Sequence, residues 1–225
     1  MADLPLYVCR RAAGPIAIDG RLDEPTWRAA DVMALSLTDT GAKPRLGTVV
    51  RTLWDDRYLY VGFHCVDTDV WATMAGRDMP LWEEEVVEIF LDDDRDGIGY
   101  FELVCNPLGA LVDVFCLHER HGTRFKALRD WNADGVLVAV TVDGDPTRRD
   151  TRDRSWTAEW AIPFDQIVMA PHVPPANGDT WRANFYRIEQ GRDAVEYTAW
   201  SPTGEINYHH PERFGTLVFS TEPAA

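Results

Sequence analysis

Alternating apolar and polar positions predict β-strands along most of the chain. The clearest stretch covers residues 86–92, which are rich in β-branched and aromatic side chains. Its odd positions, Val87, Ile89 and Leu91, share one face because successive strand side chains point to opposite sides. Glu88 lies in the middle of the other face. The pattern therefore predicts a strand that buries one face and carries a carboxylate on the other.

Similar patterns recur at short intervals from one end of the sequence to the other. Further strands are expected at residues 16–20, 47–54, 58–66, 100–106, 111–117, 136–142, 155–162, 181–188, 196–200 and 215–219. Short helical turns are expected at 22–27 and 163–167. Turns rich in Asp, Pro and Gly join neighbouring strands, and no linker or repeat divides the chain. We predict one all-β domain over residues 1–225, an antiparallel β-sandwich with jelly-roll-like, immunoglobulin-like layering.

The region around Glu88 is the strongest candidate for a site. A long loop over residues 67–81 leads to Trp82, and loops of this length commonly carry function. Trp82 is interpreted either as a ring presented to a ligand or as a cap on the core. A mid-strand carboxylate is costly without a partner, so Glu88 is either a satisfied structural acid or part of a binding face. Strand parity leads us to expect Glu102 and Asp113 on the same side as Glu88.

Composition narrows the possible partners. The net charge of −15 disfavours nucleic acid and anionic membranes as partners, because phosphates would be repelled. No apolar run is long enough to span a bilayer. The four cysteines include Cys105 and Cys116, which are out of register across their hairpin, and there is no CxxC motif, so free thiols and a reducing compartment are expected. The first residues show no signal-peptide pattern, which predicts a cytoplasmic protein unless a leader was removed. Nothing in the sequence identifies a protein partner.

An acidic run after residue 91 is a candidate calcium site. Asp92, Asp94 and Asp96 precede a glycine and begin like an EF-hand loop, but Leu103 stands where the bidentate glutamate belongs, which excludes an EF-hand. The run is therefore either a solvated hairpin turn or part of a structural calcium site. A second acidic group that could hold calcium comprises Asp19, Asp23 and Glu24.

Several stretches together resemble a known family. They cover residues 18–27, 53–61, 82–92, 181–185 and 208–215, and they follow the order found in the family 9 carbohydrate-binding modules. The resemblance implies a β-sandwich that holds the reducing end of a glucan or xylan chain between two aromatic rings, with calcium ions as structural elements. It also implies binding of a monosaccharide or oligosaccharide without catalysis.

The resemblance assigns roles to individual residues. Trp82 matches the tryptophan of the family's W-E-x-D-x-V-E-I-F motif, and Glu88 matches its last glutamate, which binds sugar hydroxyls. Tyr208 stands at the position of the second aromatic wall, where the family has tryptophan. Asn106 and Asn184 are the expected polar contacts at the sugar's rim. Both rings are expected to be presented to the ligand and to add little to folding.

One family feature is missing. Well-known members carry a sugar-binding arginine on the strand after the glutamate motif, and residues 100–106 contain no arginine. Arg77, Arg182 and Arg187 are the candidates to replace it. The departure leaves specificity for the sugar's reducing end open.

Two other functions remain as alternatives. A related sandwich family binds haem b for electron transfer through methionine with histidine or lysine, and the candidate ligands here are Met74, Met79, His64 and His209. A glycoside hydrolase would need two carboxylates on one strand face, and Glu84 and Glu88 have the i, i+4 spacing. The middle position of that spacing is Val86, which makes an accidental pair the simpler interpretation.

Overall fold

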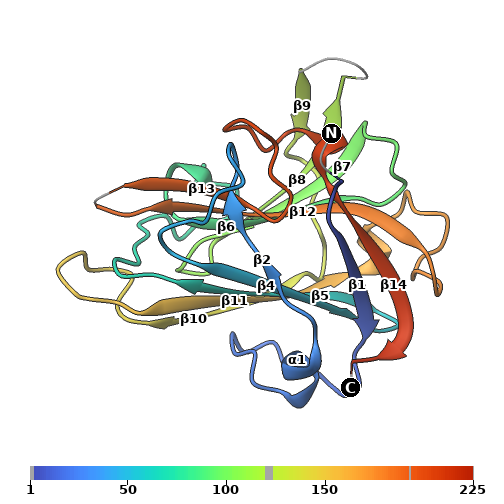
Figure 1. The fold of residues 1–225 in the computed structure, drawn as a ribbon, viewed down its shortest axis with the longest axis horizontal. Helices are drawn as coiled ribbons and strands as arrows, with labels where there is room; N and C mark the ends of the chain where they lie inside the picture. Colours follow the sequence, from blue (N-terminus) through green and yellow to red (C-terminus); the bar gives the residue numbers. More distant parts are fainter. Residues whose placement is uncertain (1–2, 120–123, 193, 225) are drawn as a thin grey trace.

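Two β-sheets pack face to face in the computed structural model, which describes residues 3–119, 124–192 and 194–224 (Figure 1). The first sheet contains β10 (Leu137–Asp143), β11 (Ser155–Pro163), β5 (Tyr58–Val66), β4 (Thr48–Trp54) and the short β2 (Met33–Ala34). The second contains β12 (Thr180–Gln190), β6 (Val86–Asp92), β7 (Gly99–Cys105), β8 (Leu111–His118), β9 (Phe125–Leu128), β13 (Val195–Ala199) and β3 (Ser36–Leu37). The predicted β-sandwich is confirmed.

A seam of two strands joins the sheets along one side. β1 (Leu6–Arg11) pairs with β4 of the first sheet, and β14 (Gly215–Pro223) pairs with β12 of the second. β1 and β14 pair with each other in parallel, as β1 also does with β4, so the sandwich is antiparallel except at this seam. The sequence pattern missed β1, because its polar half, Arg10 and Arg11, hides the alternation.

The helical elements are short. They are α1 (Pro25–Ala29) and the 3₁₀ turns η1 (Leu81–Glu83), η2 (Phe164–Gln166) and η3 (Pro211–Arg213). Trp27 of α1 is fully buried and packs with Leu53, Tyr60 and Ala161 on the outer side of the first sheet. The strand expected at 16–20 is wrong, because this segment is irregular and donates backbone hydrogen bonds to Glu159 instead of joining a sheet.

The main core lies between the two sheets, and a second cluster lies on the outside of the second sheet. Val87, Ile89 and Leu91 belong to the main core, as the alternation predicts. Val86 and Phe90 point the other way and pack under the loops that cover the outer face. This outer cluster supports the candidate site.

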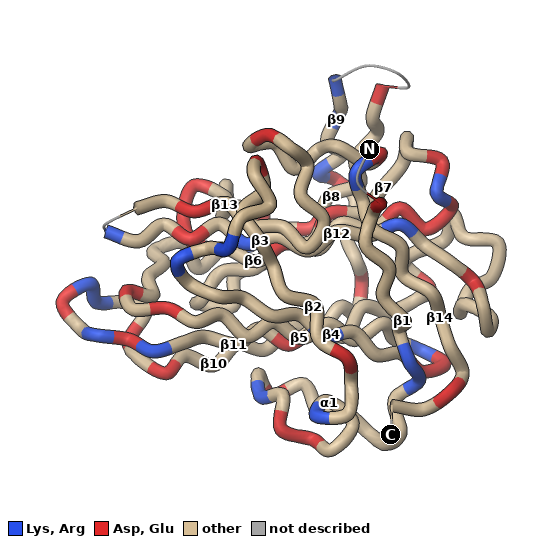
Figure 2. Tube along the Cα trace, in the orientation of Figure 1, with Lys and Arg blue, Asp and Glu red and all other residues tan. Residues whose placement is uncertain are grey.

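Charged side chains lie mainly on the loops and strand ends (Figure 2). Acidic and basic residues are both spread widely, and they alternate at the end of the β10–β11 hairpin, at the left of the view. All four cysteines are buried and free, as expected. Among the described residues, no helix is both long enough and apolar enough to cross a bilayer.

Candidate functional site

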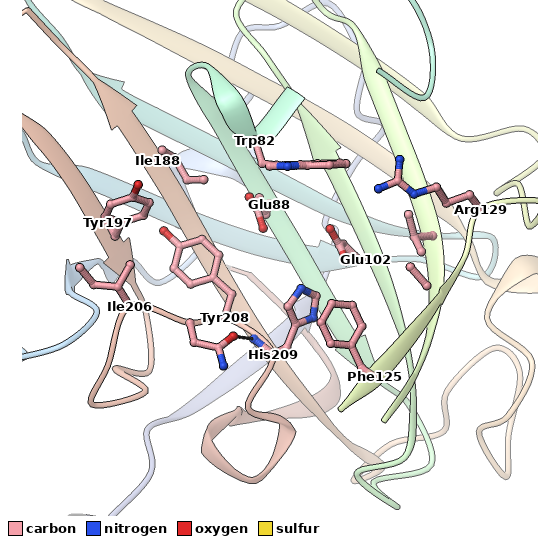
Figure 3. Close-up of a pocket in the computed structure, with 13 residues that line it drawn as sticks. Trp82, Glu88, Glu102, Phe125, Arg129, Ile188, Tyr197, Ile206, Tyr208 and His209 are labelled. Carbon is pink, nitrogen blue, oxygen red and sulfur yellow. Dashed lines mark hydrogen bonds between the residues drawn. The ribbon is translucent and has the colours of Figure 1, made fainter. Parts of the chain in front are cut away.

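A pocket of about 360 Å³ opens on the outer face of the second sheet (Figure 3). Its lining includes Trp82, Glu88, Glu102, Arg129, Tyr208 and His209. These side chains come from η1, β6, β7, the segment after β9 and the loop before η3. The volume lies at the lower end of the range for small-molecule sites. The fold therefore brings Trp82, Glu88 and Tyr208, three of the residues expected at a sugar site, into one concave surface.

Two glutamates form the floor of the pocket. In the antiparallel pairing of β6 with β7, Glu88 lies opposite Val104 and Glu102 lies opposite Phe90, which puts both carboxylates on the outer face. Their exposed fractions are only 3% and 8%. Burial and the neighbouring Glu102 raise the pKa of Glu88 well above its usual value. Burial also raises the pKa of Glu102 to about 7, although a hydrogen bond from Cys116 and the charge of Arg129 oppose the increase.

Glu88 is the member of this pair whose pKa shift includes no hydrogen bond, and its oxygens are not among the sealed, unpartnered polar atoms of the described chain. Glu102 accepts a hydrogen bond from the Cys116 thiol, with Sγ and Oε2 3.3 Å apart. Within the described part of the chain, no hydrogen bond contributes to the pKa shift of Glu88, which burial and Glu102 account for. A buried carboxylate of this kind requires a hydrogen-bonding partner. The pocket therefore offers an acceptor to a ligand donor.

Asp113 does not join the two glutamates, and the expectation that it faces their way is wrong. The β7–β8 register places it opposite Leu103, whose side chain is in the main core. Its carboxylate accepts hydrogen bonds from Arg77 and from the backbone N–H of Ala133. Side-chain parity within β8 did not reveal this, because the register depends on the intervening turn.

Trp82 forms one wall of the pocket. It lies in η1 at the entrance to β6, is half-buried, and packs at the edge of the outer cluster. The Arg129 guanidinium lies 4.9 Å from the centre of its ring, within cation–π range. In Figure 3 the Glu88 carboxylate lies between Trp82 and Tyr208.

Tyr208 lines the opposite side but is much more deeply placed than expected. Its ring stacks on Tyr186 with centroids 4.0 Å apart, and its hydroxyl donates to the backbone oxygen of Arg187 at 3.0 Å. Only 8% of the residue is exposed. Tyr208 is therefore part of the outer core as well as of the pocket, so its contribution to folding is larger than the sequence suggested.

Asn106 and Asn184 lie outside the pocket. Asn106 donates to the backbone oxygen of Met74 and accepts from two backbone N–H groups of its own turn. Asn184 donates to the Tyr186 hydroxyl and to the Ser201 backbone oxygen, each at 2.8 Å. Tyr186 then donates to the backbone oxygen of Tyr208. Asn184 supports the pocket wall from behind, and Asn106 shapes a turn, so we leave both out of the proposed contacts.

Arg129, not one of the expected arginines, supplies the cation of the pocket. Arg187 is buried against Asp67, and Arg77 pairs with Asp113. Arg182 lies near Asp92 at the other end of β12 and, like them, does not line the pocket. Sequence reasoning missed Arg129 because it follows the short β9, outside every matched motif.

His209 and Phe125 form a second aromatic pair at the pocket. Their rings stack with centroids 3.7 Å apart, and His209 Nδ1 lies 2.7 Å from the Tyr100 hydroxyl. Burial, with the charges of His118 and His210, lowers the pKa of His209 to about 4. The imidazole is therefore neutral at pH 7. The exposed Phe125 carried no signal in the sequence, since β9 is only four residues long.

The acidic turn after β6 has the geometry of a cation site. One carboxylate oxygen from each of Asp92, Asp94 and Asp96 lies within 4.8 Å of the others. Oδ1 of Asp92 is buried and has no hydrogen-bond partner among the described residues, while Oδ2 accepts from the backbone N–H of Gly97. Burial raises the pKa of Asp92 to about 7, against the opposing charge of Arg182. Clustered carboxylate oxygens are the ligands calcium prefers, so these residues fit the ion.

Two candidate residues of the alternative functions, Glu84 and His64, lie away from the pocket. Glu84 binds the 67–81 loop through the backbone N–H and hydroxyl of Thr73, so it does not face the pocket with Glu88. His209 lies on the outer face of the second sheet, whereas His64 is on the outer face of the first. His64 therefore lies apart from His209. Met74 packs against the outer cluster that supports the pocket, but it does not line the pocket with His209.

Comparisons with known proteins agree with this architecture. The model of carbohydrate-binding family 9 matches residues 17–219. The chain is 32% identical over 219 residues to endo-1,4-beta-xylanase A of Thermotoga maritima. The matched region covers 94% of this chain but only 18% of that enzyme. It is 26% identical to the Thermotoga neapolitana enzyme of the same name, covering 91% of this chain and 17% of the enzyme. The chain thus spans less than a fifth of these relatives.

Solved structures show the same fold. A family 9 module from Caldicellulosiruptor kristjanssonii in complex with cellotriose superposes with a TM-score of 0.66 at 15% identity, covering 97% of this chain and 95% of that one. A Bacteroides uniformis protein superposes with a TM-score of 0.77 at 20% identity, covering 97% of this chain and all of the other.

Proposed function

Since the chain belongs to carbohydrate-binding family 9, we propose that its pocket binds a neutral monosaccharide or the end of a short oligosaccharide without cleaving it. The observation that carries this proposal is Glu88, a buried carboxylate without a protein hydrogen-bond donor in the described chain, set between aromatic side chains. A pyranose has apolar C–H faces and a rim of hydroxyl donors. Aromatic walls and a free acceptor are complementary to both.

The roles of the walls differ. Trp82 is half-buried, so one ring face is available to cover a sugar while the nearby Arg129 guanidinium steadies the indole. Tyr208 stacks on Tyr186, so it offers a sugar less exposed ring surface than Trp82 does. Such packing against a rigid aromatic surface stabilises the bound sugar without fixing which sugar it is.

Arg129 is the proposed replacement for the arginine missing from residues 100–106. It is a cation within the pocket and lies close enough to Glu102 to lower the pKa of that carboxyl. A guanidinium carries several N–H donors and no acceptor, so Arg129 would donate to sugar oxygens while Glu88 accepts from sugar hydroxyls. One donor and one acceptor at fixed positions select the orientation of the ring.

The relatives suggest which sugars to test first. Glucose and cellotriose are bound in the Caldicellulosiruptor kristjanssonii modules, and the Thermotoga relatives are named as xylanases. We therefore propose a β-1,4-linked glucan or xylan end as the ligand class.

The test is calorimetric titration of glucose, xylose, cellotriose and xylotriose into the parent protein and two variants. Glu88→Gln should lose about tenfold or more in affinity, because an N–H₂ donor replaces one of the two carboxyl oxygens that accept from sugar hydroxyls. The matched control is Glu83→Gln, an exposed glutamate beside Trp82 that does not line the pocket. Parent-like affinity in Glu88→Gln would refute the role of this carboxylate.

We propose binding without hydrolysis, although Glu88 and Glu102 share one pocket. Family membership supports a binding module, and glycosidases need a proton donor together with an ionised partner. Aryl glycosides, cellotriose and xylotriose should remain intact on long incubation. Turnover that disappears in Glu88→Gln would make the pocket a hydrolase site.

Calcium is proposed as a structural ion at Asp92, Asp94 and Asp96. Bound there, it would supply positive charge that ties the start of the β6–β7 turn to its end. The unpartnered Oδ1 of Asp92 supports this assignment.

A further inference from the structure

A second cleft lies at the end of the sandwich, where loops from both sheets meet. We name it the arginine cleft; it measures about 360 Å³, and its main lining residues are Arg45, Asp69, Arg152, Glu189, Gly191 and Arg192. They come from the segment before β4, the segment after β5, the β10–β11 loop and the β12–β13 hairpin. This is the region where Figure 2 shows acidic and basic residues alternating at the left of the molecule. It shares no lining residue with the sugar pocket.

The charge of the arginine cleft opposes that of the whole chain. Arg45, Arg152 and Arg192 line it, and Arg149 lies against Asp69. Besides Asp69, only Glu189 contributes a carboxylate to the described lining. In the described lining, three guanidinium groups against two carboxylates leave an excess of one positive charge, whereas the chain as a whole carries −15. The electrostatic repulsion of an anion is therefore weaker at this cleft than over the acidic chain as a whole.

Arg149 and Arg192 are held in place by Asp69 before any ligand arrives. Asp69 accepts hydrogen bonds from Arg149 Nη2 at 2.5 Å and from Arg192 Nε at 3.0 Å. Burial acts to raise the pKa of Asp69, but these hydrogen bonds outweigh it and the pKa is lowered, so Asp69 stays ionised. The Arg149 guanidinium also lies 4.4 Å from the centre of the Trp71 ring. Fixed side chains lose less conformational entropy on binding.

The floor of the cleft depends on a glycine. Arg45 pairs with Glu189 at 2.8 Å, and a side chain at position 191 would clash with the Glu189 carboxylate and approach Arg45. Gly191 therefore leaves room for this pair beneath the opening. Each guanidinium has five N–H donors, and the two carboxylates use only part of the total. Donors remain for a further acceptor.

We propose that the arginine cleft binds the carboxylate of an acidic sugar, a uronate residue. Planar guanidinium groups bind carboxylates in a bidentate fashion, which fits this anion better than a point charge would. The inference rests on the proposed function, since it takes the ligand to be a glycan. It adds a second subsite, which shares no lining residue with the sugar pocket.

Glucuronic acid and glucose, which differ only at C6, test the cleft as a matched pair. In two-dimensional NMR spectra, glucuronate should shift the Nε–Hε signals of Arg45 and Arg192, which line the cleft, and glucose should leave them in place. Arg152→Ala should weaken glucuronate binding about tenfold, since a charge-assisted hydrogen bond is lost. Added salt should weaken it as well. The control is Arg154→Ala, an exposed arginine of the same loop that pairs with Asp143 outside the cleft.

Each failure has its own signature. Glucuronate binding that Arg152→Ala leaves unchanged, or arginine signals that glucuronate does not move, would overturn the cleft proposal. Glucose binding that Glu88→Gln leaves unchanged would instead overturn the pocket. Inorganic sulfate that competes as well as glucuronate would overturn the assignment to a carboxylate.

Discussion

Two glutamates, Glu159 on β11 and Glu88 on β6, lie in the middle of strands in opposite sheets, and each faces outward from the sandwich core. Both are buried, and burial raises the pKa of both. Glu159 accepts hydrogen bonds from the backbone N–H groups of Asp19 and Gly20 and from the Trp27 indole. No such hydrogen bond adds to the pKa shift of Glu88, and the pocket opens above it. The same residue type in the middle of a strand is thus hydrogen-bonded or left open to a pocket according to the segment that covers it.

The largest expected change in stability is at Glu159, the glutamate that the protein covers completely. Glu159→Ala should lower the free energy of unfolding by about 3–5 kcal/mol, because three buried donors lose their acceptor. Glu159→Gln keeps an acceptor and should cost less. Glu88→Ala should change stability by less than about 1 kcal/mol, since no donor in the described chain loses its acceptor. Urea unfolding of the three variants measures the difference, and equal losses at both positions would break the comparison.

The two aromatic walls repeat the contrast on a smaller scale. Tyr208→Ala should destabilise the protein by about 2–4 kcal/mol, because it leaves a cavity beside Tyr186. Trp82→Ala should cost less than about 1 kcal/mol, since its ring is half-buried. Both should reduce sugar affinity about tenfold or more. Thermal melts measure the loss of stability in each variant, and sugar titrations measure the loss of affinity. A Trp82→Ala protein that cannot fold would assign Trp82 to the core.

A third test uses pH. The folded pKa of Glu102 is raised to about 7 from 4.5, so between these values the folded protein holds a proton that the unfolded chain releases. Its contribution therefore favours folding at low pH and is lost as pH rises through 7, by about 2–3 kcal/mol. Glu102→Gln should reduce this fall in stability. Unfolding free energies at pH 5 and 8 measure it, and an unchanged slope in the variant would contradict the assignment.

The smallest effect concerns Asp92, another buried carboxylate with an unpartnered oxygen. If calcium is that oxygen's partner, a concentration ten times the dissociation constant should stabilise the fold by about 1.4 kcal/mol. That corresponds to a rise in melting temperature of about 3–6 °C, which EDTA should reverse. Asp94→Asn keeps the turn's hydrogen-bond acceptor and should weaken the response. A melting curve indifferent to calcium and EDTA would leave the turn as solvated surface.

The sequence predicted the sandwich well because burial repeats with period two. β5 and β6 match their expected ranges, with alternate residues such as Phe63 and Ile89 in the core. Period-two patterns do not report how a strand is paired, so the parallel seam and the direction of Asp113 were not predictable. The seam joins strands more than 200 residues apart, a contact that no local pattern encodes.

At the candidate site, residues within a recognisable sequence motif could be placed from sequence, and residues outside such motifs could not. Trp82 and Glu88 stand on a recognisable strand entrance, and both line the pocket. Arg129 and Phe125 come from an irregular hairpin whose position depends on the whole sheet. The amide of Asn184 was misplaced for another reason. It lies opposite Phe90 on the outer face of the sheet, but the 201–208 segment covers it and uses its hydrogen bonds.

The parallel pairing of β1 with β14 has a mechanical consequence. The chain enters the seam at Leu6 and leaves it near Pro223, at opposite ends of two strands that run in the same direction (Figure 1). A pull on these two points draws the strands past each other, so the evenly spaced hydrogen bonds of the ladder share the load. Pulling apart the β8–β9 hairpin at its open end would break its bonds one at a time. Under tension between residues 6 and 223 the module should yield at a higher force than under tension across β8 and β9, a difference that single-molecule force spectroscopy measures.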